Sequence, residues 1–122
     1  MGNDIKQPAA SPSSHEANRR LAELLGWTDL FSTGGAWLGQ PPGVLPPSRV
    51  PDWCGDWAAC GPLQAQYVRR LYVWPHRVVV GTTPGGPDGY DVMLDRSQGE
   101  TGEQLLRRTI VTAIIKHLEM GL

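Results

Sequence analysis

The chain has 122 residues, which is enough for one domain and too few for two of ordinary size. Apolar residues make up 40 % of it and five are tryptophans, which argues against a largely disordered protein. Its net charge of −1 gives no basic footprint for a polyanion, and no apolar run is long enough to span a membrane, so the composition argues against nucleic acid or membrane as partner.

The N-terminal segment, residues 1–12, is polar and has almost nothing to bury, so we expect a flexible arm followed by one domain over residues 13–120. It has no secretory leader pattern, which favours a cytosolic protein with reduced thiols. Ser13 and Glu16 fit a capping box and predict a helix start. Leucines at helical spacing continue that helix to Gly26, a residue suited to ending it.

A hairpin and a proline loop are expected next. Two short extended runs, residues 28–33 and 36–40, flank Gly34-Gly35, a pair that tolerates the positive φ angles of a tight turn. The following segment, residues 39–57, contains five prolines, so neither a helix nor a central strand can pass through it. We expect a semi-rigid loop.

After the loop, Asp56 is placed to cap a helix that begins at Trp57. Gly61-Pro62 either kinks this helix or ends it, in which case Pro62 begins a second helix. Apolar residues at helical spacing then predict helix as far as Leu71.

The C-terminal part predicts two strands and a helix. The valine run at residues 77–82 is typical of a central strand buried on both faces, and residues 90–94 alternate as an antiparallel partner does. Residues 83–89 between them form a loop. A second capping box at Thr101 begins a helix to about residue 119 whose wide apolar face indicates deep packing. Together these elements predict an α+β fold with a small, mostly antiparallel sheet that has helices on both faces.

The first sixty residues also resemble a known family in order and spacing. The matching stretches are Asn18-Arg19-Arg20-Leu21-Ala22-Glu23 before Gly26-Trp27, then Trp37-Leu38-Gly39-Gln40-Pro41-Pro42-Gly43, then Val50-Pro51-Asp52-Trp53-Cys54 and Asp56. The C-terminal strand pair and helix match in pattern alone, so the resemblance covers roughly residues 15–119. They resemble the phage α-β-α sandwich domain family, small proteins of bacteriophages and prophages with no assigned activity. The resemblance implies a three-layer α-β-α sandwich, a phage or prophage source, and a location in the host bacterial cytosol. It implies no catalytic residue.

No residue set amounts to a catalytic, metal or cofactor signature. Cys54 and Cys60 have five residues between them, a poor zinc spacing, and are more simply two small buried residues. Three histidines with nearby aspartates allow a triad to be drawn, but no spacing demands one. The glycine-rich residues 81–89 have no lysine and precede a strand, unlike a phosphate-binding loop. The arginine pairs at 19–20, 69–70 and 107–108 are interpreted as solvated helix faces.

The tryptophans around the proline loop form the candidate binding site. Aromatic rings with fixed charges between them suit base stacking or a protein interface, although packing over a sheet edge explains them more simply. The candidate residues are Trp37, Arg49, Asp52, Trp53, Asp56 and Trp57. The sequence favours a non-enzymatic phage accessory protein that binds a host or phage protein or associates with itself, with a host-modulating or anti-defence role as one form of this. A module that binds or sequesters a small nucleotide is the alternative, and an enzyme acting on such a ligand is a weaker one.

Overall fold

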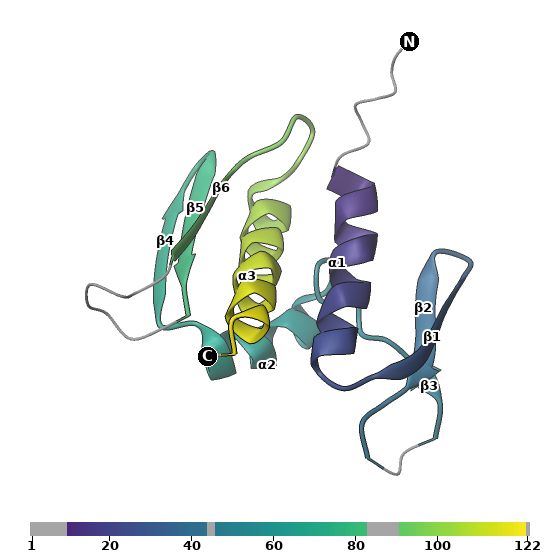
Figure 1. The fold of residues 1–122 in the computed structure, drawn as a ribbon. Coiled ribbons are helices and arrows are strands. Elements are labelled where there is room, and N and C mark those ends of the chain that lie inside the picture. The colour runs from purple at the N-terminus through teal and green to yellow at the C-terminus, as the bar shows by residue number, and fades with distance from the viewer. Residues whose placement is uncertain (1–9, 44–45, 83–90, 122) are drawn as a thin grey trace.

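The computed structural model describes residues 10–43, 46–82 and 91–121. Within these residues three helices and six strands follow one another in the order α1, β1, β2, β3, α2, β4, β5, β6, α3 (Figure 1). The α+β class expected from the sequence is therefore confirmed. The predicted loop at 83–89, Tyr90 and most of the predicted N-terminal arm lie outside the described residues.

The strands form two separate three-stranded sheets, each antiparallel. One sheet consists of β1 (Thr28–Thr33), β2 (Ala36–Gln40) and β3 (Ser48–Arg49), with β2 in the middle. The Gly34-Gly35 turn between β1 and β2 is confirmed, with φ angles of 58° and 83° that non-glycine residues adopt at a cost. Of the described residues between 41 and 57, only Ser48 and Arg49 join the sheet, and they do so at its edge.

The second sheet consists of β4 (Arg70–Trp74), β5 (Arg77–Gly81) and β6 (Asp91–Asp95), with β5 central. Its inner face carries Val78 and Val80, which are fully buried, against α3. The expectation that β5 is buried on both faces is wrong, because its outward residue Val79 is only partly buried and no described element covers that face.

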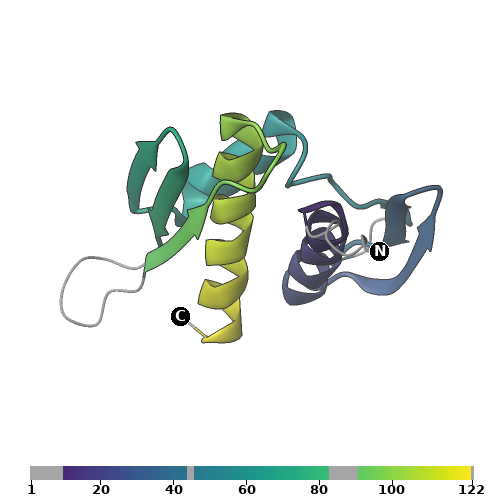
Figure 2. The ribbon, with the colours of Figure 1, turned by 90° about the horizontal axis from the view of Figure 1, so that it is seen from above.

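Helices α1 and α3 lie between the two sheets (Figures 1 and 2). From one side to the other the layers are sheet β4–β6, then α3 (Gly102–Glu119), then α1 (Ala10–Leu24), then sheet β1–β3. This differs from the expected single sheet with helices on both faces. The β4–β6 sheet buries only the face that carries Val78, Val80 and Val92, which packs on α3, and α3 packs on α1 on its other side. In the β1–β3 sheet most side chains are exposed or half-buried, and α1 contacts this sheet at β2.

The helix boundaries correct two expectations. α1 begins at Ala10, so Ser13 to Glu16 lies within it rather than at its start. α2 (Trp57–Tyr67) continues through Pro62 as one helix, which settles the alternative left open by Gly61-Pro62. It ends at Tyr67, whereas the sequence predicts helix as far as Leu71. Arg70 to Trp74 instead form strand β4, because their β-branched and aromatic side chains pair along β5.

One core holds these layers together. α3 contributes the largest share of it, five of the fourteen buried apolar residues of the core cluster, and α1 adds Leu21 and Ala22. α3 begins as the sequence predicts: the Thr101 hydroxyl accepts from the Gln104 amide and the Gln104 side chain accepts from the Thr101 amide.

Candidate functional site

The six candidate residues do not form one surface. Trp37, Arg49 and Asp52 line a pocket of about 170 Å³ between α1, β2 and the proline loop. Trp53 is buried in the core, Asp56 caps α2, and Trp57 packs partly buried against the core. The structure therefore brings three of the six candidate residues together in one pocket. The other three stabilise the fold.

The ring of Trp37 is already engaged by its own chain. It stacks on the His15 ring at 4.7 Å between centroids with 19° between the planes, and its Nε1 donates to the His15 carbonyl oxygen at 3.0 Å. The Arg19 guanidinium lies 5.9 Å from the same ring. The pocket beside it is smaller than the 300–1,000 Å³ usual for sites that hold drug-sized ligands.

Asp52 joins the proline loop to α1. Its Oδ1 accepts from Asn18 Nδ2 at 2.8 Å and from the Gly55 amide at 3.1 Å, while Asn18 Oδ1 accepts from the Cys54 amide at 3.2 Å. The turn needs glycine at 55, because a Cβ there would lie 2.3 Å from Asp52 Oδ2. The Asp52 carboxylate thus fixes a turn, and that turn sends Trp53 and Cys54 into the core.

Asp56 caps α2 as the sequence predicts, because its Oδ1 accepts from the Ala58 amide at 3.0 Å. We expect Asp56→Ala to lower the free energy of unfolding by about 1 kcal/mol, since one amide of the first turn loses its acceptor. Urea denaturation measures this. Asp56→Asn keeps a capping oxygen and is the control; equal losses in the two variants would contradict the capping role.

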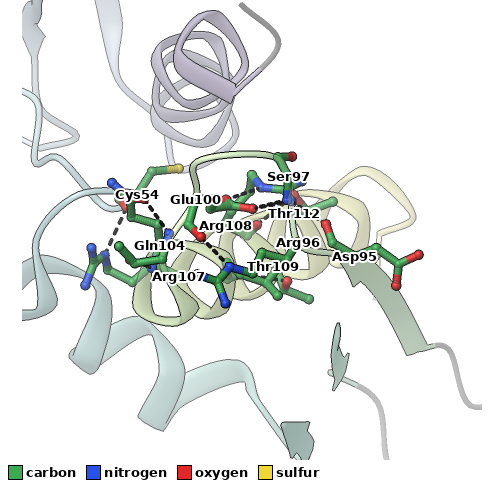
Figure 3. Close-up of polar contacts among 12 residues, drawn as sticks. Cys54, Asp95, Arg96, Ser97, Glu100, Gln104, Arg107, Arg108, Thr109 and Thr112 are labelled. Carbon is green, nitrogen blue, oxygen red and sulfur yellow. Dashed lines mark hydrogen bonds and ion pairs between the residues drawn. The ribbon is translucent and has the colours of Figure 1, made fainter. Parts of the chain in front are cut away.

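A larger cavity, of about 480 Å³, adjoins the first and is lined mainly by polar residues: Ser14, Asp52, Cys54, Gly55, Gln98, Gly99, Glu100, Gln104 and Arg107. Its principal charged and amide side chains have partners within the chain. Arg107 Nε donates to the Cys54 carbonyl oxygen at 3.0 Å, and Glu100 pairs with Arg108 at 2.8 Å (Figure 3). This cavity therefore presents polar groups that already serve the fold.

The cysteines are not suited to nucleophilic chemistry. Both are free and buried, and burial raises the pKa of Cys54 to about 12 and that of Cys60 to about 11. Both thiols are protonated at neutral pH. Within the described part of the chain, no group of three or more histidine, cysteine or acidic side chains is placed to hold a metal ion.

The arginine pairs were only partly interpreted correctly. Arg19 and Arg20 form exposed ion pairs on α1, as expected. Arg107 is buried instead, with its guanidinium 5.2 Å from the Trp57 ring, and Arg108 is largely buried against Glu100. Their burial could have been expected from their position inside the apolar run of α3, because a helix that packs on several sides has little surface exposed to solvent.

The exposed large apolar side chains gather on sheet β4–β6, a surface that sequence reasoning missed because β4 was assigned partly to helix. Tyr72 and Trp74 lie on the outer face with Val79 and Met93, and the two rings stack at 6.2 Å with 27° between planes. A hollow of about 220 Å³ lies among Trp74, His76, Arg77, Val79 and Met93. We call Leu71, Tyr72, Val73, Trp74, Val79 and Met93 the β4 surface.

A scan against protein-family models finds no match to this chain, and neither the search of curated proteins nor that of solved structures finds a significant match. The resemblance to the phage α-β-α sandwich family thus stays a prediction. No helix among the described residues is long and apolar enough to cross a membrane.

Proposed function

We propose that the protein is a non-enzymatic interaction module that binds a protein partner through the β4 surface. The observation that carries the proposal is β4 itself, in which four consecutive apolar residues, from Leu71 to Trp74, are exposed. Single exposed apolar residues are ordinary, but these four lie together around the edge of the sheet, Tyr72 and Trp74 on its outer face and Leu71 and Val73 on its α3 face. Apolar residues grouped in this way mark a binding surface. Aromatic side chains in such a patch supply most of the binding energy at protein interfaces.

The polar surroundings of the patch also suit a protein partner. Arg77 Nε lies 2.7 Å from Asp95 Oδ1, so an ion pair borders the apolar residues and satisfies both charges locally. Interfaces commonly have such a polar rim around an apolar centre. The nucleotide alternative has weaker support, because the pocket that includes Trp37 and Arg49 is small and the Trp37 ring is engaged by His15. In biological terms, we propose that the chain is an accessory protein of a phage or prophage that acts on a host or phage protein.

Photo-crosslinking in the producing cell tests the proposal. With p-benzoylphenylalanine at position 72, we expect discrete covalent adducts whose cross-linked peptides are identified by mass spectrometry. The same group at position 31 is the matched control, since Phe31 is also a strongly exposed aromatic residue, on the other sheet. Equal adduct yields at positions 72 and 31 would show that the β4 surface has no special partner.

A further inference from the structure

We propose that the β4 surface binds a second copy of this chain, with the two β4 strands paired antiparallel about a twofold axis at Tyr72. This inference rests on the proposed function and names the partner. It would join the two β4–β6 sheets into one six-stranded sheet with both α3 helices on the same face.

The first argument is that β4 is an unprotected edge strand. Only β5 pairs with it among the described residues, so its other side presents backbone donors and acceptors. Proteins usually protect such edges with a proline, a bulge or charged side chains. Between Leu71 and Trp74 this strand has no proline and no charged side chain, its one charge is Arg70 at its start, and its pairing with β5 runs without a register shift.

The second argument is that the exposed residues lie on both faces of the edge. Leu71 and Val73 pair with Val80 and Val78 and so share the α3 side of the sheet, while Tyr72 faces outward. Val73 is nevertheless 56 % exposed, because α2 lies beside Leu71 at the start of this edge and no described element covers Val73 itself. A partner that only covered the outer face would leave Val73 in water, whereas an added strand gives the side chains on both faces new cross-strand neighbours.

The third argument is that β4 is complementary to itself in one register. A twofold axis keeps outward residues opposite outward residues only when the paired residue numbers add to an even sum. With the axis at Tyr72, all five residues pair, Leu71 lies opposite Val73 of the copy, and Tyr72 lies opposite its counterpart. With the axis one residue later, Leu71 would face Pro75, which has no amide hydrogen to donate.

Charge also favours this pairing of two copies. Arg70 is the only charged residue of β4, and antiparallel pairing places the two copies of it about 14 Å apart, beyond the screening length of about 8 Å at physiological salt. A parallel pairing would set them side by side. The net charge of −1 per chain adds little repulsion between the copies.

The expected area sets the strength of the dimer. Leu71 to Trp74 expose on the order of 400 Å² of apolar surface, about half of the roughly 800 Å² per partner that a stable interface buries. Backbone hydrogen bonds along the new strand pair supply further contact. We therefore expect a dimer that dissociates at micromolar concentrations.

Sedimentation velocity of the full chain tests the inference, with concentrations from about 1 to 200 µM. We expect a shift from a monomer of 13.3 kDa to twice that mass as concentration rises. Val73→Glu should weaken the dimer at least about tenfold, because each carboxylate would lie against the apolar Leu71 of the other copy and lose hydration without gaining a partner. Phe31→Glu is the matched control, since Phe31 is also 56 % exposed, and it should leave the dimer unchanged. A chain that stays monomeric throughout, or a dimer equally sensitive to both changes, would overturn the inference.

A cysteine variant tests the register and keeps the inference falsifiable if Val73→Glu fails to fold. Residues that face each other across an antiparallel pair are close enough for a disulfide, so Tyr72→Cys should form an intermolecular disulfide under mild oxidation. Met93→Cys is the control on the same face but on β6, at the far edge of the sheet, and should not. The two native thiols are buried and stay silent. Equal disulfide yields in the two variants would overturn the register.

The outcomes separate this inference from the proposed function. Crosslinks from position 72 to the chain itself support both. Crosslinks from position 72 to another protein, with a monomer in sedimentation, would refute the self-pairing and leave the interaction module in place. A monomer with no preferential crosslinking at position 72 would refute both.

Discussion

Trp53→Ala is expected to lower the free energy of unfolding by about 3–5 kcal/mol, because the indole is a large side chain in the centre of the structure. Trp53 is 5 % exposed, and it belongs to the same core cluster as Leu21 and Ile110. Removing it leaves a cavity that the turn around it cannot close, since Asp52 holds that turn in place through Asn18 and Gly55. Denaturation followed by circular dichroism measures the loss, since tryptophan fluorescence itself changes.

Trp74→Ala is the matched control for this prediction. Trp74 is 50 % exposed at the edge of the β4–β6 sheet, so we expect its loss to cost less than about 1 kcal/mol. The two variants remove the same group and differ only in where it lies. If Trp53→Ala cost no more than Trp74→Ala, the placement of Trp53 in the core would be wrong. The expected pattern also separates the roles: Trp53 maintains the fold, and Trp74 is available to a partner.

Features determined by neighbouring residues could be predicted from the sequence. The Gly34-Gly35 turn, the Asp56 cap and the Thr101 capping box each depend on a few residues within one turn of chain, and all three are confirmed. The capping box at Ser13 is the exception, because α1 begins three residues earlier, at Ala10. Local chemistry also predicted the valine strand and its antiparallel partner. These elements were sufficient for the α+β class.

Features that depend on distant neighbours could not be predicted in this way. The apolar residues from Leu63 to Leu71 fit helical spacing, but Arg70 to Trp74 form a strand because β5 is present to pair with them. The burial of Trp53 depends on Asn18, which is 34 residues from the Asp52 that it binds. Composition alone therefore predicted a binding site among the tryptophans of the proline loop. In the folded chain those rings contact other parts of the same chain, and Tyr72 and Trp74 are exposed instead.

The ion pair between Glu100 and Arg108 leads to the second large prediction. The Glu100 side chain is 4 % exposed, and it accepts from Arg108 Nε at 2.8 Å, from Arg108 Nη2 at 2.9 Å and from the Ser97 amide at 2.9 Å (Figure 3). Burial raises the pKa of this carboxyl, but the hydrogen bonds from Arg108 and Ser97 and the Arg108 charge together outweigh burial and hold the pKa below its usual 4.5. A carboxyl with a lowered pKa stabilises the fold above pH 4.5, and this stabilisation is lost as the pH falls through the lowered value.

Arg108→Ala should lower the free energy of unfolding by about 3 kcal/mol at pH 7, because it leaves the Glu100 carboxylate buried without its cation. It should also reverse the contribution of Glu100 to the pH dependence. With the arginine absent, burial dominates and raises the pKa of Glu100, so protonation of Glu100 stabilises the variant as the pH falls toward the usual value. Urea denaturation between about pH 4 and 7 measures both effects, and Glu100→Gln in each background subtracts the other carboxyls. Parallel pH profiles with and without Arg108 would show that the arginine does not control the pKa of the Glu100 carboxyl. In that case groups other than this ion pair would hold the segment between β6 and α3 against α3.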